Sequence, residues 1–125
     1  MSLILDTGAL LALERNDRAM WTRLKGALLD HEPPKTHAGV VAQAWRGGAR
    51  QARLATALHS TEIHPIDEAT GRTIGQLLGA ANHADIVDAA VALLADDGDD
   101  IITSDHDDLA RLCNTLGRHV ELIHP

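Results

Sequence analysis

The stretch that decides the fold spans residues 3–13 and reads Leu3-Ile4-Leu5-Asp6-Thr7-Gly8-Ala9-Leu10-Leu11-Ala12-Leu13. Its first three residues form an apolar run that is typical of a strand buried on both faces of a parallel sheet. A helical apolar pattern begins two residues after Asp6, and either Asp6 or Thr7 can cap that helix. In open α/β sheets, ligands bind beside the carboxyl ends of the strands. Asp6 is therefore either a plain helix cap or a site residue.

The rest of the chain alternates apolar runs with helical patterns. Further short strands are expected at residues 35–37, 61–66, 101–103 and 120–123. Between them, helical spacing predicts helices after Asp17, at 40–45, at 50–59, after Asp67, at 86–95 and at 105–116. Strands separated by helices predict a parallel, doubly wound, three-layer α/β/α sandwich. The length of 125 residues fits a single domain, residues 1–125.

Composition excludes several classes of function. The net charge of −7 argues against non-specific nucleic-acid binding through a basic surface. Two Trp residues, with no Phe or Tyr, leave no platform for stacking bases. The single cysteine, Cys113, lies in an apolar helical pattern and is expected to be a buried structural thiol. With no disulfide, signal peptide or membrane-spanning run expected, the sequence favours a cytoplasmic protein without a membrane partner.

The carboxylates are unevenly distributed. No Lys or Arg occurs in residues 73–110, yet nine of the 18 acids lie there, all of them Asp. Two segments, Asp85-Ile86-Val87-Asp88 and Asp105-His106-Asp107-Asp108, place acids three residues apart at the start of an expected helix. Either pair is also compatible with simple capping, and Asp85 and Asp88 fit a solvated face opposite the apolar stripe.

Taken together, the acids at three expected helix starts indicate more than capping. Two carboxylates about 4 Å apart repel by roughly 4 kcal/mol at an effective dielectric constant near 20. A cluster of three at one end of a parallel sheet therefore needs a counter-charge. An all-oxygen ligand set favours Mg²⁺ or Mn²⁺ over Zn²⁺.

Three segments in this order resemble one known family. Residues 3–10, Leu3-Ile4-Leu5-Asp6-Thr7-Gly8-Ala9-Leu10, resemble the opening of PIN domains, small nucleases that include the VapC-type toxins of bacterial toxin–antitoxin modules. Residues 85–92, Asp85-Ile86-Val87-Asp88-Ala89-Ala90-Val91-Ala92, look like the third acidic motif of that family. Residues 101–109, Ile101-Ile102-Thr103-Ser104-Asp105-His106-Asp107-Asp108-Leu109, are similar to the fourth. The order and spacing agree over essentially the whole chain.

The resemblance implies an endoribonuclease that depends on Mg²⁺ or Mn²⁺ and cuts single-stranded or loop RNA. By position, Asp6, Asp88 and Asp105 would be the metal ligands and catalytic residues, with Asp85 and Asp108 as outer members. Thr103 would orient a carboxylate or the attacking water. The implied partners are an RNA substrate, a cognate VapB-like antitoxin and a second copy of the chain in a homodimer.

One position departs from the family pattern. The second PIN motif normally has a Glu on the helix after strand two, whereas the matching segment Ala38-Gly39-Val40-Val41-Ala42-Gln43-Ala44-Trp45 has Gln43 there. Glutamine keeps a carbonyl oxygen but removes the charge, so metal affinity should fall. The alternative hypothesis is a degenerate, catalytically weak PIN domain that acts as a binding or regulatory protein.

Three arginines are candidates for RNA contact. Arg46, Arg50 and Arg53 have spacings of four and three, which would place them on one helix face if the break at Gly47-Gly48 falls outside the helix. Such a face could contact phosphates, although a plain solvated face explains the same spacing. His83 and His106 adjoin the acids, are expected to face solvent and receive no role.

Overall fold

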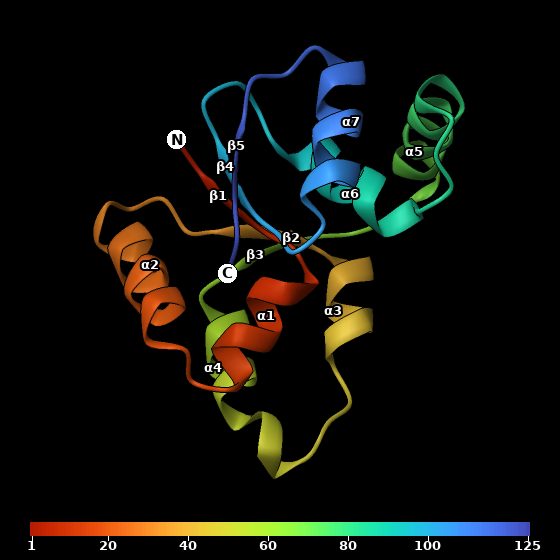
Figure 1. Cartoon of the computed structure of the whole chain (residues 1–125). Helices are drawn as coiled ribbons and strands as arrows, with labels where there is room; N and C mark the ends of the chain where they lie inside the picture. Colours follow the sequence, from red (N-terminus) through yellow and green to blue (C-terminus); the bar gives the residue numbers. More distant parts are fainter.

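The sheet has five strands, all parallel, in the order β3-β2-β1-β4-β5. The computed structural model describes all residues, Met1–Pro125, and Figure 1 shows the chain from the N-terminus in red to the C-terminus in blue. The strands are β1 Leu3–Leu5, β2 Lys35–His37, β3 Glu62–His64, β4 Asp100–Ile102 and β5 Glu121–Ile123. The parallel sheet with β1 at its centre confirms the expected topology.

Helices cover both faces of this sheet (Figure 1). α1 Thr7–Glu14, α2 Arg18–Leu29, α3 Ala38–Ala44 and α4 Ala52–His59 connect β1, β2 and β3, with the 3₁₀ turn η1 Ala49–Gln51 just before α4. α5 Glu68–Ala81, α6 Ile86–Leu94 and α7 His106–Leu116 make the connections to β4 and β5. The three-layer α/β/α sandwich in a single domain is therefore confirmed.

The inner strands β1 and β4 are short but deeply buried. Ile4 and Leu5 of β1 and Ile101 and Ile102 of β4 are at most 1% exposed, within one core cluster of 25 apolar residues. Burial on both faces explains why these strands are continuous apolar runs rather than alternating ones. Three of the five strands begin or end one or two residues away from the expected bounds.

The strand order reverses beside β1, and this places the site. The chain moves outward from β1 through β2 to β3, and then crosses to β4 on the other side of β1. Helices on opposite faces of the sheet leave a crevice at such a switch point, outside the carboxyl ends of the two strands. Asp6 follows β1 directly and Thr103 follows β4 directly, so both lie at this crevice.

The prediction that Arg46, Arg50 and Arg53 share one helix face is wrong. α3 ends at Ala44, and Gly47 and Gly48 have φ angles of +86° and +90°, which a helix cannot accommodate. Arg46 therefore lies in a loop, while Arg50 belongs to η1 and Arg53 to α4. The break falls between the arginines, as the two glycines require, and not outside them.

Buried Gln51 holds this loop. Its Oε1 accepts from the backbone N–H groups of Arg46 (2.7 Å) and Gly47 (2.8 Å). Its Nε2 donates to Glu14 Oε1 (2.5 Å) and to the carbonyl of Ala44 (2.8 Å). The amide thus ties the loop after α3 to the end of α1.

Gln51→Glu should destabilise the protein by about 1–3 kcal/mol, because a carboxylate would turn the Nε2 donor into an acceptor facing Glu14 and a carbonyl. Urea unfolding followed by circular dichroism measures the loss. Gln76→Glu on the exposed side of α5 adds the same charge without a buried partner and serves as the control. Equal urea midpoints for the two variants would contradict the role given to Gln51.

No single helix is long and apolar enough to cross a membrane. The one helix pair that passes on length and composition together, α5 with α6, is bent by 104°.

Candidate metal centre

Asp6 is held rigidly at the carboxyl end of β1. It is 3% exposed and is the N-cap of α1. Its Oδ1 accepts from the Thr7 N–H (2.8 Å), and its Oδ2 accepts from the hydroxyl of Thr103 (2.7 Å). The Thr103 hydroxyl also accepts from the Asp105 N–H (2.9 Å). Thr103 therefore orients the Asp6 carboxylate, as the resemblance implied, and fixes the start of α7 beside it.

Asp88 is brought to the same place by α6. Asp85 caps that helix, since its Oδ1 accepts from the Asp88 N–H (2.9 Å). Asp88 is only 5% exposed, so a solvated face is the wrong interpretation for this residue. Residues 89–92, Ala89-Ala90-Val91-Ala92, are all buried as well. α6 is thus enclosed on nearly every side, and an apolar stripe does not define its outer face.

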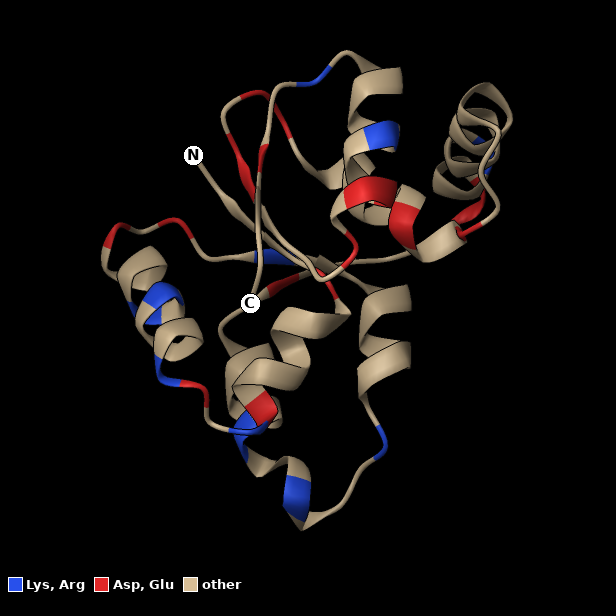
Figure 2. Cartoon of the chain, viewed as in Figure 1, with Lys and Arg blue, Asp and Glu red and all other residues tan.

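Asp105 completes a three-carboxylate cluster. It precedes α7, makes no side-chain capping hydrogen bond and is exposed. One carboxylate oxygen each from Asp6, Asp88 and Asp105 lie within 4.8 Å of one another. The three residues singled out in the sequence therefore converge between the ends of β1 and β4. Figure 2 shows acidic residues at the starts of α6 and α7, next to this crevice.

The electrostatics of the cluster call for a cation. Burial raises the pKa of Asp88 to about 7, with further contributions from the charges of Asp85, Asp6 and Asp105. Burial also raises the pKa of Asp6, with the charges of Asp105 and Asp85 acting in the same direction against the hydrogen bonds from Thr103 and Thr7. No Lys or Arg forms an ion pair with any of these acids. Three converging oxygens without a counter-charge fit a hard divalent ion such as Mg²⁺ or Mn²⁺.

His83 borders the cluster, although it was expected to face solvent. Its side chain is 13% exposed, and Nε2 lies 3.5 Å from Asp88 Oδ2. His83, Asp88 and Asp108 form a second group of potential ligand atoms within 4.8 Å. Asp108 therefore lies beside Asp88 and His83, and is not one of the three residues of the Asp6 cluster. No signal in the sequence predicted this contact, because His83 lies in the non-helical segment before α6, where no periodic pattern applies.

Gln43 lies next to the cluster without joining it. It is exposed on α3, and its Oε1 accepts a hydrogen bond from the Thr7 hydroxyl. Thr7 in turn donates its N–H to Asp6. Gln43 thus contacts the cluster only indirectly, through Thr7, and its amide supplies no negative charge.

The arginines line two different cavities. Arg46 and Arg50 border a cavity that also contains Gln43, with a volume of about 470 Å³. Arg53 instead borders a neighbouring cavity with Arg18 and Lys25. None of these five cations forms an ion pair. Basic residues gather on α2, η1 and α4, away from the acidic helix starts (Figure 2).

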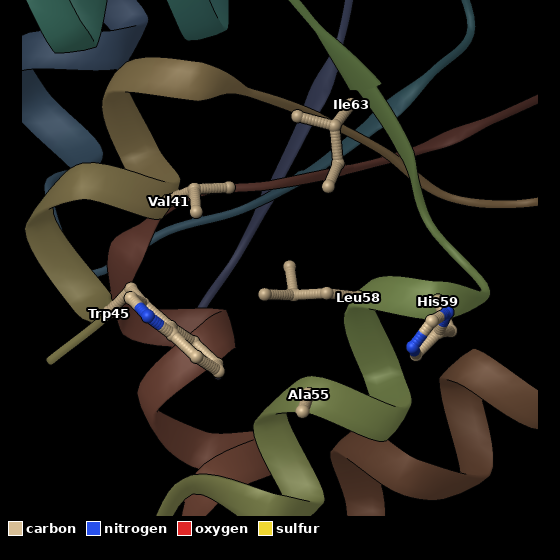
Figure 3. Close-up of a pocket in the computed structure, with 6 residues that line it drawn as sticks. All are labelled: Val41, Trp45, Ala55, Leu58, His59 and Ile63. Atoms are coloured by element: carbon tan, nitrogen blue, oxygen red, sulfur yellow. The ribbon is translucent and has the colours of Figure 1, made fainter. Parts of the chain in front are cut away.

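An apolar cavity lies on the same face of the sheet as α3 and α4. Figure 3 shows the side chains of Val41 and Trp45 facing Leu58 and Ala55, with Ile63 of β3 closing one side. Its volume is about 400 Å³, and His59 stands at its rim. The cavity contains no carboxylate and is separate from the metal centre.

No protein-family model and no curated protein matches this chain.

Proposed function

We propose that this chain is a metal-dependent endoribonuclease of the PIN type, which hydrolyses RNA phosphodiester bonds as the toxin of a toxin–antitoxin pair. The observation that carries the proposal is the convergence of Asp6, Asp88 and Asp105 within 4.8 Å at the switch point of the sheet. Capping alone accounts for acids at helix starts, but it does not require three of them to meet. The order of the acidic motifs in the sequence supports the same function.

In this proposal each residue has a defined task. Asp6, Asp88 and Asp105 hold Mg²⁺ or Mn²⁺, while Thr103 fixes the Asp6 carboxylate and Asp85 fixes the first turn of α6. A divalent ion in such a site supplies Lewis-acid chemistry for phosphodiester hydrolysis. Asp108 and His83 border the site as outer members.

The RNA contacts would come from a separate cavity formed by α1, α3 and η1. Arg46 and Arg50 share a cavity with Gln43, which contacts Thr7 beside Asp6. Phosphate contacts position a strand without reading its sequence. Because this acidic chain attracts RNA poorly overall, these cations would supply the local attraction. Arg53 would contact phosphate only on a longer strand, since it borders another cavity.

The biological setting is proposed on the resemblance alone. It comprises a VapB-like antitoxin as partner, a homodimer and a cytoplasmic location.

Cleavage of total cellular RNA by the purified protein tests the proposed reaction. With Mg²⁺ or Mn²⁺ we expect discrete RNA fragments, and with a chelator we expect none. Asp96→Asn is the control for loss of a carboxylate outside the cluster. Asp96 is exposed beyond the C-terminal end of α6, so this variant should cut RNA as the wild type does. Wild-type protein that is folded, binds Mn²⁺ and leaves all RNA intact would contradict the nuclease proposal.

The second candidate is the degenerate PIN domain, which the neutral Gln43 favours. Here the chain keeps the fold and the metal site but cleaves weakly, and acts by binding. An absence of cleavage with intact metal binding would select this candidate.

Gln43→Glu tests whether Gln43 occupies the second acidic position, which is the premise of the second candidate. The position is exposed, so the added charge is solvated and the fold is kept, and Glu can still accept from the Thr7 hydroxyl. A charge restored beside the cluster should tighten Mn²⁺ binding about tenfold and raise the cleavage rate. Calorimetric Mn²⁺ titration measures the change, with Gln76→Glu as the control. Unchanged affinity would mean that Gln43 does not occupy the second acidic position.

A further inference from the structure

The cations of this chain are concentrated in one part of the fold. Residues 15–53 contain eight of the 11 Lys and Arg but only three of the 18 Asp and Glu, so this segment carries a charge of +5 while the rest of the chain carries −12. Figure 2 shows its basic residues on α2, η1 and α4, away from the acidic starts of α6 and α7. The net charge of −7 therefore conceals a basic end of the molecule.

A cavity of about 450 Å³ at this end is lined by cations and by no carboxylate. Arg18 and Lys25 of α2 and Arg53 of α4 border this basic cavity, and none of the three forms an ion pair. Its remaining lining residues are neutral, namely Asn16, Trp21 and Thr22. Three like charges around one cavity repel one another, and an anion between them would relieve that repulsion.

The spacing of residues along α2 builds one wall of the basic cavity. Arg18, Trp21 and Lys25 are three and four residues apart, so they share one face of the helix. The Trp21 Nε1–H donates to the carbonyl of Leu13 (3.1 Å), which ties this face to the end of α1. Arg23 lies on the same helix but does not line the cavity.

The two acids nearest in sequence are engaged elsewhere. Glu14 accepts a hydrogen bond from Gln51 (2.5 Å), and Asp17 accepts one from the Met20 N–H (3.0 Å). Neither lines the basic cavity. The cations there are therefore free to bind an anion from outside the protein.

The chemistry of the walls selects an oxyanion. The guanidinium groups of Arg18 and Arg53 present N–H donors in a fork that matches the oxygens of a phosphate or a carboxylate, and Lys25 adds a compact positive charge. A cation would be repelled by all three side chains. A neutral ligand would leave their mutual repulsion in place.

The position of the cavity favours a phosphate of an RNA strand. α1 begins beside Asp6 and ends just before Asn16, and its eight residues span about 12 Å. Between these ends, Leu11 lines the cavity that Arg46 and Arg50 border. A phosphodiester strand is charged at every nucleotide, so one strand can place a phosphate at the metal centre and others in both cavities. An acidic peptide has no phosphodiester for the metal centre to cleave.

We propose that the basic cavity lined by Arg18, Lys25 and Arg53 is a phosphate subsite that holds the RNA strand about one length of α1 away from the metal centre. This inference rests on the proposed ribonuclease function and deepens it, because it identifies where the strand continues beyond the scissile bond. The acidic remainder of the chain repels a polyanion and so directs the strand to this end.

The salt dependence of RNA binding in the presence of a chelator tests the subsite without cleavage. A labelled single-stranded oligouridylate of about 12 nucleotides is titrated by fluorescence anisotropy at several salt concentrations. The logarithm of the association constant falls with the logarithm of the salt concentration, by about 0.7 for each phosphate contacted. The double variant Lys25→Gln with Arg53→Gln should lower this slope by about 0.7 and weaken binding at low salt at least about tenfold.

A second double variant, Arg23→Gln with Arg72→Gln, is the matched control. It loses the same two charges from exposed helix positions, and neither residue lines the basic cavity. Its slope should equal that of the wild type, with an affinity within about twofold. If both double variants weaken binding equally, or if the wild type binds no RNA, the subsite is overturned.

Two competitors distinguish the source of the anion. Inorganic phosphate and an oligoglutamate peptide are each added to the wild-type complex at the same concentration of negative charge as the RNA, and neither should displace it. Displacement by inorganic phosphate indicates a site for the free ion, and displacement by oligoglutamate indicates a site for an acidic protein. Either result overturns the RNA subsite.

The two proposals fail separately. Metal-dependent cleavage by a protein whose salt slope is unchanged in the Lys25→Gln and Arg53→Gln double variant overturns only the subsite. A reduced slope in that variant, in a protein that cleaves no RNA with Mg²⁺ or Mn²⁺, overturns the nuclease and leaves the phosphate site in place.

Discussion

Asp88→Asn should lower metal-dependent RNA cleavage at least about a hundredfold, because loss of one ligand charge removes several kcal/mol of transition-state stabilisation. The same variant should melt at a higher temperature than wild type in the presence of a chelator at about pH 8. The reason is that Asp88 is buried among like charges that raise its pKa to about 7. A metal-ligating carboxylate is expected to support activity and, at the same time, to destabilise the metal-free fold.

The sign of the stability effect follows from proton linkage. The pKa of Asp88 is about 7 in the folded protein, while an unfolded Asp has a pKa of about 3.9. Between these values the folded state holds a proton that the unfolded state has released, so metal-free stability falls as pH rises through this window. The advantage of Asp88→Asn in melting temperature should therefore be large at about pH 8 and small at about pH 5.

Asp96→Asn provides the control for both readouts. Because Asp96 is exposed and outside the cluster, this variant should cleave RNA like wild type and show no pH-dependent gain in stability. If Asp88→Asn behaved like Asp96→Asn in cleavage and melting, Asp88 would have no part in a metal centre.

Magnesium should stabilise the protein strongly at alkaline pH and weakly at acidic pH. At a hundredfold excess of free ion over its dissociation constant, binding adds about 2.7 kcal/mol to the free energy of unfolding. Below about pH 7 the protons on Asp88 compete with the ion, because a ligand carboxylate must be deprotonated and the pKa of Asp88 is about 7. Differential scanning calorimetry with Mg²⁺ or chelator at each pH measures this response.

Asp6→Asn should abolish the magnesium response, since it removes the most firmly held of the three carboxylates. A melting temperature that Mg²⁺ raises equally at both pH values, or equally in wild type and Asp6→Asn, would place the ion elsewhere.

The fold followed from local patterns in the sequence. Short apolar runs predicted β1 and β4, which are covered on both faces of the sheet, and β1 ended at the expected residue, Leu5. Asp6 and Asp105 were placed correctly because each follows a strand, and the carboxyl ends of parallel strands share one edge. The bounds of several strands and helices differed by one or two residues, since the ends of short elements depend on their neighbours in the fold.

The contacts of the site depended on tertiary packing. Periodicity suggested a solvated face for Asp88, but α5 and α7 both pack on α6 and enclose it. His83 gave no periodic signal, because it lies in the segment between α5 and α6. The face of three arginines failed at Gly47 and Gly48, whose positive φ angles break the helix within the set.

Anomalous diffraction from crystals soaked in Mn²⁺ at about pH 8, where Asp88 is ionised, locates the ion directly. The predicted result is a peak at bonding distance from carboxylate oxygens of Asp6, Asp88 and Asp105, which disappears in Asp6→Asn and persists in Asp96→Asn. A wild-type crystal without a peak at these carboxylates, or with manganese bound by His83 and Asp108 away from Asp6, would contradict the metal centre.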